Sequence, residues 1–344
     1  MIRILLFGDF WNRQPLAYAP IRDRLADRIV FVEDAADAQI ALFSHSHDLT
    51  RHGRALSRLV ALHPDLRPVL LSEEPFWDSC WSADPFASYR MAQDGLVRFG
   101  YAVVNHFTSD VFDTERIPYF LLTDPRYVAQ LSPLFDRNAG LGVDDWVRRW
   151  QAPQWDAVFM AERRQGPRHA PVFADREVWG LSVLRSRIAR TCEGASILRA
   201  GKGWEDEPGR GELDDWHLDK LTRLAGTCRY VSAIENTHQA NYVTEKIFDA
   251  FAVGAVPLYI ATRSHRVGRY VGSDAWVNLR DRLPLEGAAF QPFDAGAAVG
   301  ADLAGGYTVV QAQLARLFAD GAVVEDELDL LADRLFEALQ RLTL

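Results

Sequence analysis

The segment from Tyr230 to Tyr259 constrains the fold of this chain more than any other. An apolar run opens the segment, a polar stretch and a helical pattern follow, and a second apolar run closes it. Thr244 is a favourable N-cap residue and Gly254 ends the helical pattern, so we predict a helix over residues 245–252. In an open parallel α/β sheet, ligands bind beyond the carboxyl ends of the strands. The polar stretch before the helix is therefore the expected ligand site.

The same alternation of short apolar runs and helical patterns extends along the whole chain and predicts an α/β fold. A chain of 344 residues also predicts two domains, of roughly 150 residues each. We place the linker within 131–153, with one domain over 1–150 and a second over 151–320. The predicted strands are 2–7, 29–32, 40–44, 68–71, 101–104, 157–161, 230–234 and 256–260, and the predicted helices include 54–63 and 177–192.

The last segment, residues 321–344, carries leucines at steps of three and four residues, which form one apolar stripe on a helix. The opposite face carries mainly Glu and Asp rather than Lys and Arg, so membrane attachment is disfavoured. We expect this amphipathic helix to pack on the body of the protein.

Glu245 and Lys246 lie in the first turn of the predicted helix. The positive end of the helix dipole opposes a cation there, at a cost of about a few tenths of a kcal/mol, unless an anion is bound nearby. Free backbone N–H groups, the dipole and the Lys246 ammonium together suit a diphosphate. Glu245 can accept hydrogen bonds from ribose hydroxyls, and Tyr242 can donate one to phosphate or sugar. For each residue alone, a solvated position on the helix remains the competing interpretation.

The ordered combination of these residues resembles the signature of the alpha-1,3/4-fucosyltransferases, glycosyltransferase family 10, in its bacterial type. The resemblance rests on Glu235-Asn236, Tyr242-Val-Thr244-Glu245-Lys246, Ala250 and Gly254-Ala-Val-Pro257. It implies a GT-B architecture, in which two Rossmann-like domains face a cleft, with GDP-fucose on the C-terminal domain and the acceptor across the cleft. It also places Asn236, Tyr242, Glu245 and Lys246 at donor-binding positions.

Two further matches lie outside this signature. Leu184-Arg185 resembles the donor-phosphate arginine of the family, with Arg187 as a rival position. Ser72-Glu73-Glu74-Pro75, after an apolar run, resembles the strand and glutamate of the acceptor-side domain. The resemblance implies Glu73 as the catalytic base of an inverting transfer, with Glu74 as the alternate and a plain turn carboxylate as the competing interpretation.

The chain departs from the family pattern at Ala261-Thr-Arg-Ser-His265, where a glycine and then a small-residue and proline stretch are usual. The donor sugar can therefore be fucose or another GDP-hexose. Trp11 and His45 follow predicted strands of the first domain and are candidate acceptor-site residues. For Trp11 alone, ordinary packing is the competing interpretation.

Composition limits the remaining classes of function. A net charge of −9 opposes binding to nucleic acid or anionic lipid. Three scattered cysteines suit neither a disulfide framework nor a zinc site, and no apolar run is long enough to span a membrane. We therefore expect a cytoplasmic protein with at most peripheral membrane contact. We expect no obligatory metal or cofactor, GDP-fucose as donor and a glycan acceptor that contains N-acetylglucosamine, against the alternative of a non-catalytic nucleotide- or glycan-binding module.

Overall fold

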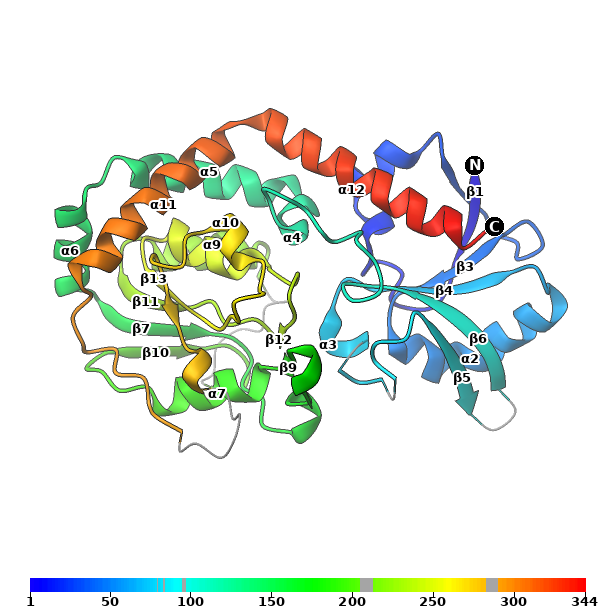
Figure 1. Ribbon diagram of the computed structural model, residues 1–344, viewed down its shortest axis with the longest axis horizontal. Coiled ribbons are helices and arrows are strands. Elements are labelled where there is room, and N and C mark those ends of the chain that lie inside the picture. Colours follow the sequence, from blue (N-terminus) through cyan, green and yellow to red (C-terminus); the bar gives the residue numbers. More distant parts are fainter. Residues whose placement is uncertain (79, 83, 95–96, 205–212, 283–289) are drawn as a thin grey trace. The chain divides into compact units, whose positions relative to one another are not determined.

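The computed structural model of the protein describes residues 1–78, 80–82, 84–94, 97–204, 213–282 and 290–344. The chain forms two compact units, one made of Met1–Asp124 with Val324–Leu344 and the other of Pro125–Val323 (Figure 1). Both units are α/β with mainly parallel sheets, which confirms the predicted fold class. The division after Asp124 falls earlier than the boundary expected near residue 150.

The first unit is built on a six-stranded sheet of order β2-β1-β3-β4-β6-β5, in which only β5 runs antiparallel to its neighbour. Its strands are β1 Ile2–Leu6, β2 Ile29–Phe31, β3 Ile40–Phe43, β4 Arg67–Leu71, β5 Tyr89–Asp94 and β6 Val97–Val104. Its helices are α1 Ala19–Arg22, α2 Ser46–Leu62, α3 Pro75–Asp78 and α4 Tyr119–Leu122, with 3-10 turns at Pro15–Ala17 and Asp23–Leu25. All four residues of β3 are buried, as in a parallel strand that is covered on both faces.

Helix α2 packs against β4 and β6 and begins at Ser46, well before the predicted start at Arg54. The reason is an unusual N-cap. The His45 ring accepts a hydrogen bond from the backbone N–H of His47 at 2.9 Å. This N–H group belongs to the first turn of the helix and has no acceptor within the helix.

The last helix, α12 Gly321–Arg341, packs in the first unit from Val324 onward. The predicted stripe is buried at Leu328, Leu331, Leu335 and Leu339. Its acidic face pairs with arginines of the first unit, and Asp329 accepts from Arg24 at 2.7 Å. The tail therefore packs on the body, as the stripe indicated.

The second unit contains a five-stranded sheet of order β10-β7-β11-β13-β14, which is parallel throughout, and a small three-stranded sheet of order β12-β9-β8, which is antiparallel. Its strands are β7 Trp155–Met160, β8 Val172–Phe173, β9 Val178–Gly180, β10 Ile197–Ala200, β11 Cys228–Ser232, β12 Thr237–His238, β13 Val256–Tyr259 and β14 Val277–Asn278. Its helices are α5 Pro125–Ala139, α6 Val143–Gln151, α7 Ser182–Thr191, α8 Trp216–Leu224, α9 Glu245–Ala252, α10 Val267–Tyr270 and α11 Ala301–Ala319, with 3-10 turns at Pro167–His169, Ala174–Arg176 and Arg280–Arg282.

Helix α9 packs against β11 and β13, and α5 and α11 pack outside it (Figure 1). In the same view, α7 lies on the opposite side of the sheet. Two expectations differ from the structure in this unit. The expected linker over 131–153 is helical, because Trp146 and Trp150 are buried against Tyr307 of α11. The helix expected over 177–192 is preceded by β9, which pairs with β12, so the helix itself begins only at Ser182.

The predicted helix over 245–252 is confirmed as α9, residue for residue. Thr244 lies at its N-cap, and Gly254 has a φ of +80° just beyond its end, a backbone conformation that suits glycine. Within the described residues, no helix is both long enough and apolar enough to cross a bilayer.

Candidate functional site

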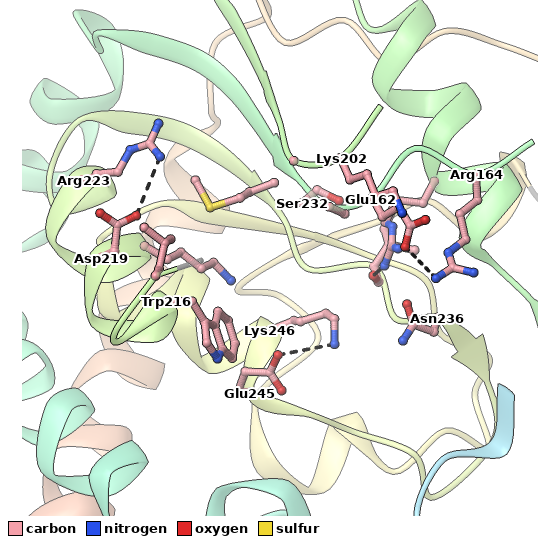
Figure 2. A pocket seen from close by; sticks show the side chains of 17 residues that line it. Glu162, Arg164, Lys202, Trp216, Asp219, Arg223, Ser232, Asn236, Glu245 and Lys246 are labelled. Carbon is pink, nitrogen blue, oxygen red and sulfur yellow. Dashed lines mark hydrogen bonds and ion pairs between the residues drawn. The ribbon is translucent and has the colours of Figure 1, made fainter. Parts of the chain in front are cut away.

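A cavity of about 430 Å³ lies in the second unit, around the carboxyl ends of β7 and β11 (Figure 2). Helices α7, α8 and α9 contribute its other walls. The described lining includes six cationic side chains and three carboxylates. These are Arg164, Arg185, Lys202, Lys220, Arg223 and Lys246, and Glu162, Asp219 and Glu245. A basic cavity beyond the strand ends is suited to an anionic ligand.

Glu235 holds the start of α9 in place. Its carboxylate is 2% exposed and accepts hydrogen bonds from the backbone N–H of Thr244 at 2.9 Å and from the Thr244 hydroxyl at 2.8 Å. Burial raises the pKa of Glu235, although the neighbouring Lys246 ammonium opposes this shift. The signature glutamate therefore acts as a buried anchor for the first turn of the helix.

The Lys246 ammonium is surrounded by side-chain oxygen atoms at the start of α9. Its Nζ is 3.0 Å from Glu235 Oε2, 3.5 Å from Glu245 Oε1 and 2.8 Å from the Thr244 hydroxyl. Burial lowers the pKa of Lys246, but the two glutamates outweigh burial and the net shift is upward. The expectation that this cation lacks compensation without a bound anion is therefore wrong, because Glu235 supplies the anion from within the protein. The side chain is 21% exposed and lines the cavity.

Arg185 and Asn236 also line the cavity, so the structure brings both together with Glu245 and Lys246. Arg185 is buried on α7 and donates to the carbonyl oxygen of Ile234 at 3.0 Å. This bond ties α7 to the chain immediately before Glu235. The rival Arg187 is exposed on the same helix and stacks on the Phe290 ring at 4.0 Å.

Tyr242 is placed differently from the other donor-site candidates. It is 1% exposed, in the turn that precedes α9, and its backbone N–H donates to the carbonyl oxygen of Gln239 at 3.0 Å. The described cavity lining does not include it. The structure therefore brings Tyr242 near the helix start but not onto the cavity wall.

Sequence reasoning missed the contribution of α8, which supplies Trp216, Asp219, Lys220 and Arg223 to the lining. No motif marks these residues. The one signal in the sequence that could have indicated Lys220 was the rarity of lysine. The sequence contains only three lysines, and all three line this cavity.

In the first unit, Glu73 follows β4 as predicted and is 1% exposed. Its Oε1 accepts from the Tyr18 hydroxyl at 2.9 Å and from Arg13 Nε at 3.2 Å, and its Oε2 accepts from the Tyr119 hydroxyl at 2.8 Å. Burial in this arrangement raises the pKa of Tyr119 well above its ordinary value, and the Glu73 charge adds to the effect. Glu74 is also buried and accepts from the backbone N–H of Phe76 at 3.2 Å, at the start of α3.

The two acceptor-site candidates differ in exposure. Trp11 is 48% exposed. His45 is 4% exposed, caps α2 and stacks on Trp77 with a ring separation of 4.6 Å. Burial, followed by the charges of His47 and nearby arginines, lowers the pKa of His45 to about 4. His45 is thus a neutral, structural ring in this unit.

One group of possible metal ligands occurs among the described residues, formed by Asp9, Asp48 and His52, with ligand atoms within 4.8 Å of one another. Asp48 Oδ1 accepts from the backbone N–H of Asp9 at 2.8 Å, and Arg51 donates to Asp9 at 3.0 Å. The Arg51 guanidinium, which is bound to the Asp9 carboxylate, competes with a metal cation at this position.

The second unit is thus a parallel α/β domain with a cavity beyond its strand ends, where ligands bind in open α/β sheets. Residues 204–285 match glycosyltransferase family 10 (fucosyltransferase), C-terminal region. The resemblance to that family is therefore confirmed for this segment, which includes Asn236, Tyr242, Glu245 and Lys246.

Similar proteins include 4-galactosyl-N-acetylglucosaminide 3-alpha-L-fucosyltransferase 9 of Homo sapiens and of Mus musculus. Each is 29% identical over 61 residues, which are 18% of this chain and 17% of the length of the relative. A solved alpha1,3-fucosyltransferase aligns over 95% of this chain and 81% of its own, with 13% identity and a TM-score of 0.43. A structure of alpha1,3-fucosyltransferase with GDP-fucose aligns over the same shares, with 13% identity and a TM-score of 0.42.

Proposed function

We propose that this protein is an inverting alpha-1,3-fucosyltransferase, which transfers L-fucose from GDP-fucose to a hydroxyl of a glycan that contains N-acetylglucosamine. The observation that carries the proposal is the convergence of three family-signature positions, Asn236, Glu245 and Lys246, and of Arg185 on one basic cavity. The family match over 204–285 and the names of the similar proteins support the choice of donor and linkage.

The cavity binds the GDP moiety through its cations. Lys246 and Arg185 contact the diphosphate, and the first-turn N–H groups of α9 face the same anion. Glu245 accepts hydrogen bonds from the ribose hydroxyls, and Asn236 orients the donor sugar. Tyr242 contributes to donor binding indirectly. It is buried in the turn that precedes α9 and helps to position the start of that helix.

Glu73 acts as the catalytic base. The acceptor hydroxyl attacks the anomeric carbon of fucose from the face opposite GDP, and a new carbon–oxygen bond forms as the bond to the β-phosphate oxygen breaks. The hydroxyl proton passes to Glu73, and GDP leaves with the bonding electron pair. Arg13 is 44% exposed, so it is the contact of Glu73 that an incoming hydroxyl can replace, whereas Tyr119 is buried and holds the other oxygen. Trp11 offers an exposed ring on which an acceptor sugar stacks.

The cytoplasm of a bacterium is the proposed location. Cys80, Cys192 and Cys228 are free and buried, and burial raises the pKa of the Cys192 and Cys228 thiols to about 11. Such thiols are suited to a reducing compartment.

The direct test measures GDP release from a panel of GDP-sugars in the presence of a glycan array that includes N-acetyllactosamine. We expect GDP release from GDP-fucose with an N-acetylglucosamine-containing acceptor, and a product of inverted configuration by NMR. Consumption of another GDP-hexose alone would assign a different donor. Binding of GDP without turnover of any donor would indicate a non-catalytic module.

A further inference from the structure

All three lysines of the chain line a single cavity. The sequence has 38 Lys and Arg residues, and outside Lys202, Lys220 and Lys246 every one of them is arginine. Lysine meets phosphate as a compact point charge, whereas arginine meets it with a planar fork. The confinement of lysine to this cavity makes its three ammonium groups candidates for phosphate contacts.

Lys220 lies on α8 and is held by a buried network. Its Nζ donates to Asp249 Oδ2 at 2.9 Å, and the other carboxylate oxygen, Oδ1, lies 2.7 Å from Nε2 of His217. Lys220 is 7% exposed, His217 3% and Asp249 is fully buried. Asp249 lies on α9, one turn after Glu245, so the network joins α8, which bears Lys220, to α9, which bears Lys246.

The hydrogen bonds of His217 hold its ring in place. Nδ1 lies 2.5 Å from Gln130 Oε1, and the Gln130 amide nitrogen donates to Asp215 at 2.8 Å, which fixes the orientation of the amide. Burial raises the pKa of Asp249, but Lys220 and then His217 outweigh it, so the net shift is downward and Asp249 is a carboxylate. Both ring nitrogens of His217 therefore face acceptors, which fix the ring against Asp249.

Lys220 and His217 thus share one buried carboxylate at the wall of the cavity. Each lining acid is paired with a lining cation, because Glu162 pairs with Arg164 at 2.6 Å, Asp219 with Arg223 at 3.7 Å and Glu245 with Lys246 at 3.5 Å. The described lining nevertheless carries six cationic side chains against three carboxylates, so it suits an anionic ligand. Lys220 is the member of the Asp249 network that lines the cavity, so it is the group of this network that can contact such an anion.

We propose that Lys220 is a second lysine ligand of the donor diphosphate, with Asp249 and His217 as its positioning residues. The proposal rests on the proposed function, because it assigns a further phosphate contact within the same cavity. Lys246 and Lys220 then approach the diphosphate from α9 and α8, and the Asp249 carboxylate fixes the distance between the two helices.

Calorimetric titration of Lys220→Met with GDP and with guanosine tests this assignment. We expect the dissociation constant for GDP to rise about tenfold or more, since a charge-assisted phosphate contact is lost, and that for guanosine to change less than about twofold. Lys220→Arg should recover part of the GDP affinity. An equal loss for GDP and guanosine, or no loss, would overturn the proposal. Absence of GDP binding by the unaltered protein would instead refute the proposed function.

Arg223→Met is the matched control, because Arg223 lines the same cavity one turn further along α8 and is 38% exposed. We expect a smaller loss of GDP affinity than in Lys220→Met. An equal loss would show that only the summed charge of the cavity matters, and the specific role of Lys220 would be overturned.

A second measurement is made on the unaltered protein and needs conservative Lys→Arg variants only for assignment. Lysine labelled with carbon-13 at Cε gives three side-chain resonances in the unaltered protein, which separate Lys→Arg variants assign. We expect GDP to shift the Lys220 and Lys246 resonances, and guanosine to leave Lys220 in place. A Lys220 resonance that stays still while GDP moves Lys246 would contradict the proposal.

Discussion

Glu73 of the first unit and Glu235 of the second have similar surroundings, and we propose different roles for them. Each follows a strand of a parallel sheet, each is at most 2% exposed, and each accepts from a tyrosine hydroxyl and a cation. They differ in the exposure of the cation. Lys246 is 21% exposed and is also bound to Thr244 at the helix start, whereas Arg13 is 44% exposed and its guanidinium also lies over the Trp77 ring at 4.9 Å. We propose that the more exposed partner is the easier one to displace, so that Glu73 is the reactive carboxylate and Glu235 the anchor.

The largest expected effect is that of Glu73→Gln on turnover. The amide keeps hydrogen bonds to Tyr18 and Tyr119 but cannot take a proton, so we expect transfer to fall about 10²–10⁴-fold while GDP affinity is unchanged. Turnover is measured with GDP-fucose and an accepted glycan, and GDP affinity by calorimetry.

Glu74→Gln is the control for this variant, since Glu74 is equally buried but serves the backbone at Phe76. Normal turnover in Glu73→Gln together with its loss in Glu74→Gln would transfer the role of base to Glu74 and end the proposed contrast between Glu73 and Glu235.

Glu235→Gln should act mainly on stability. Breaking a fully buried ion pair costs about 3–5 kcal/mol, and we expect about 2–3 kcal/mol here because Lys246 is partly exposed. The free energy of unfolding in urea measures the effect. If Glu235→Gln kept its stability but lost turnover, Glu235 would be the reactive carboxylate and the comparison would be reversed.

Lys246→Ala tests the ligand-facing side of the same pair. Loss of one charge-assisted phosphate contact, worth about 1.5–3 kcal/mol, should weaken GDP binding roughly tenfold to a hundredfold. Titration with GDP measures the change. Lys202→Ala, at an exposed position of the same cavity, serves as the control and should weaken binding less. A greater effect at Lys202 would place the phosphate away from the start of α9.

Most of the fold could be predicted because its signals are local. Helix α9 is bounded by Thr244 and Gly254, whose capping roles depend only on neighbouring backbone, and the buried strands are apolar runs. The helix expected over 177–192 failed because β9 forms through pairing with β12, a partner far along the chain. The linker over 131–153 failed because Trp146 and Trp150 were not recognised as a packing face.

The site could be predicted only where a motif marked it. Asn236, Glu245 and Lys246 belong to a contiguous signature, and they line the cavity. Tyr242 belongs to the same signature but is buried, because neighbours in sequence on a turn point in different directions. Lys220 depends on a network that spans residues 130–249, which local spacing does not reveal.

The smallest expected effects come from Tyr119 and Tyr259, one tyrosine donor to each of these glutamates. Tyr119 donates to Glu73 at 2.8 Å and Tyr259 donates to Glu235 at 3.5 Å, and burial raises the pKa of both hydroxyls, so each remains protonated as a donor. We expect Tyr119→Phe to cost about 1 kcal/mol of unfolding free energy, since a well-formed hydrogen bond to a charged group is removed, and Tyr259→Phe to cost less. Urea unfolding measures both. Because Tyr119 fixes the oxygen of Glu73 that Arg13 does not contact, its loss should also lower kcat, while Tyr259→Phe leaves kcat unchanged. A fall in kcat for Tyr259→Phe alone would mean that the carboxylate needing precise placement is Glu235.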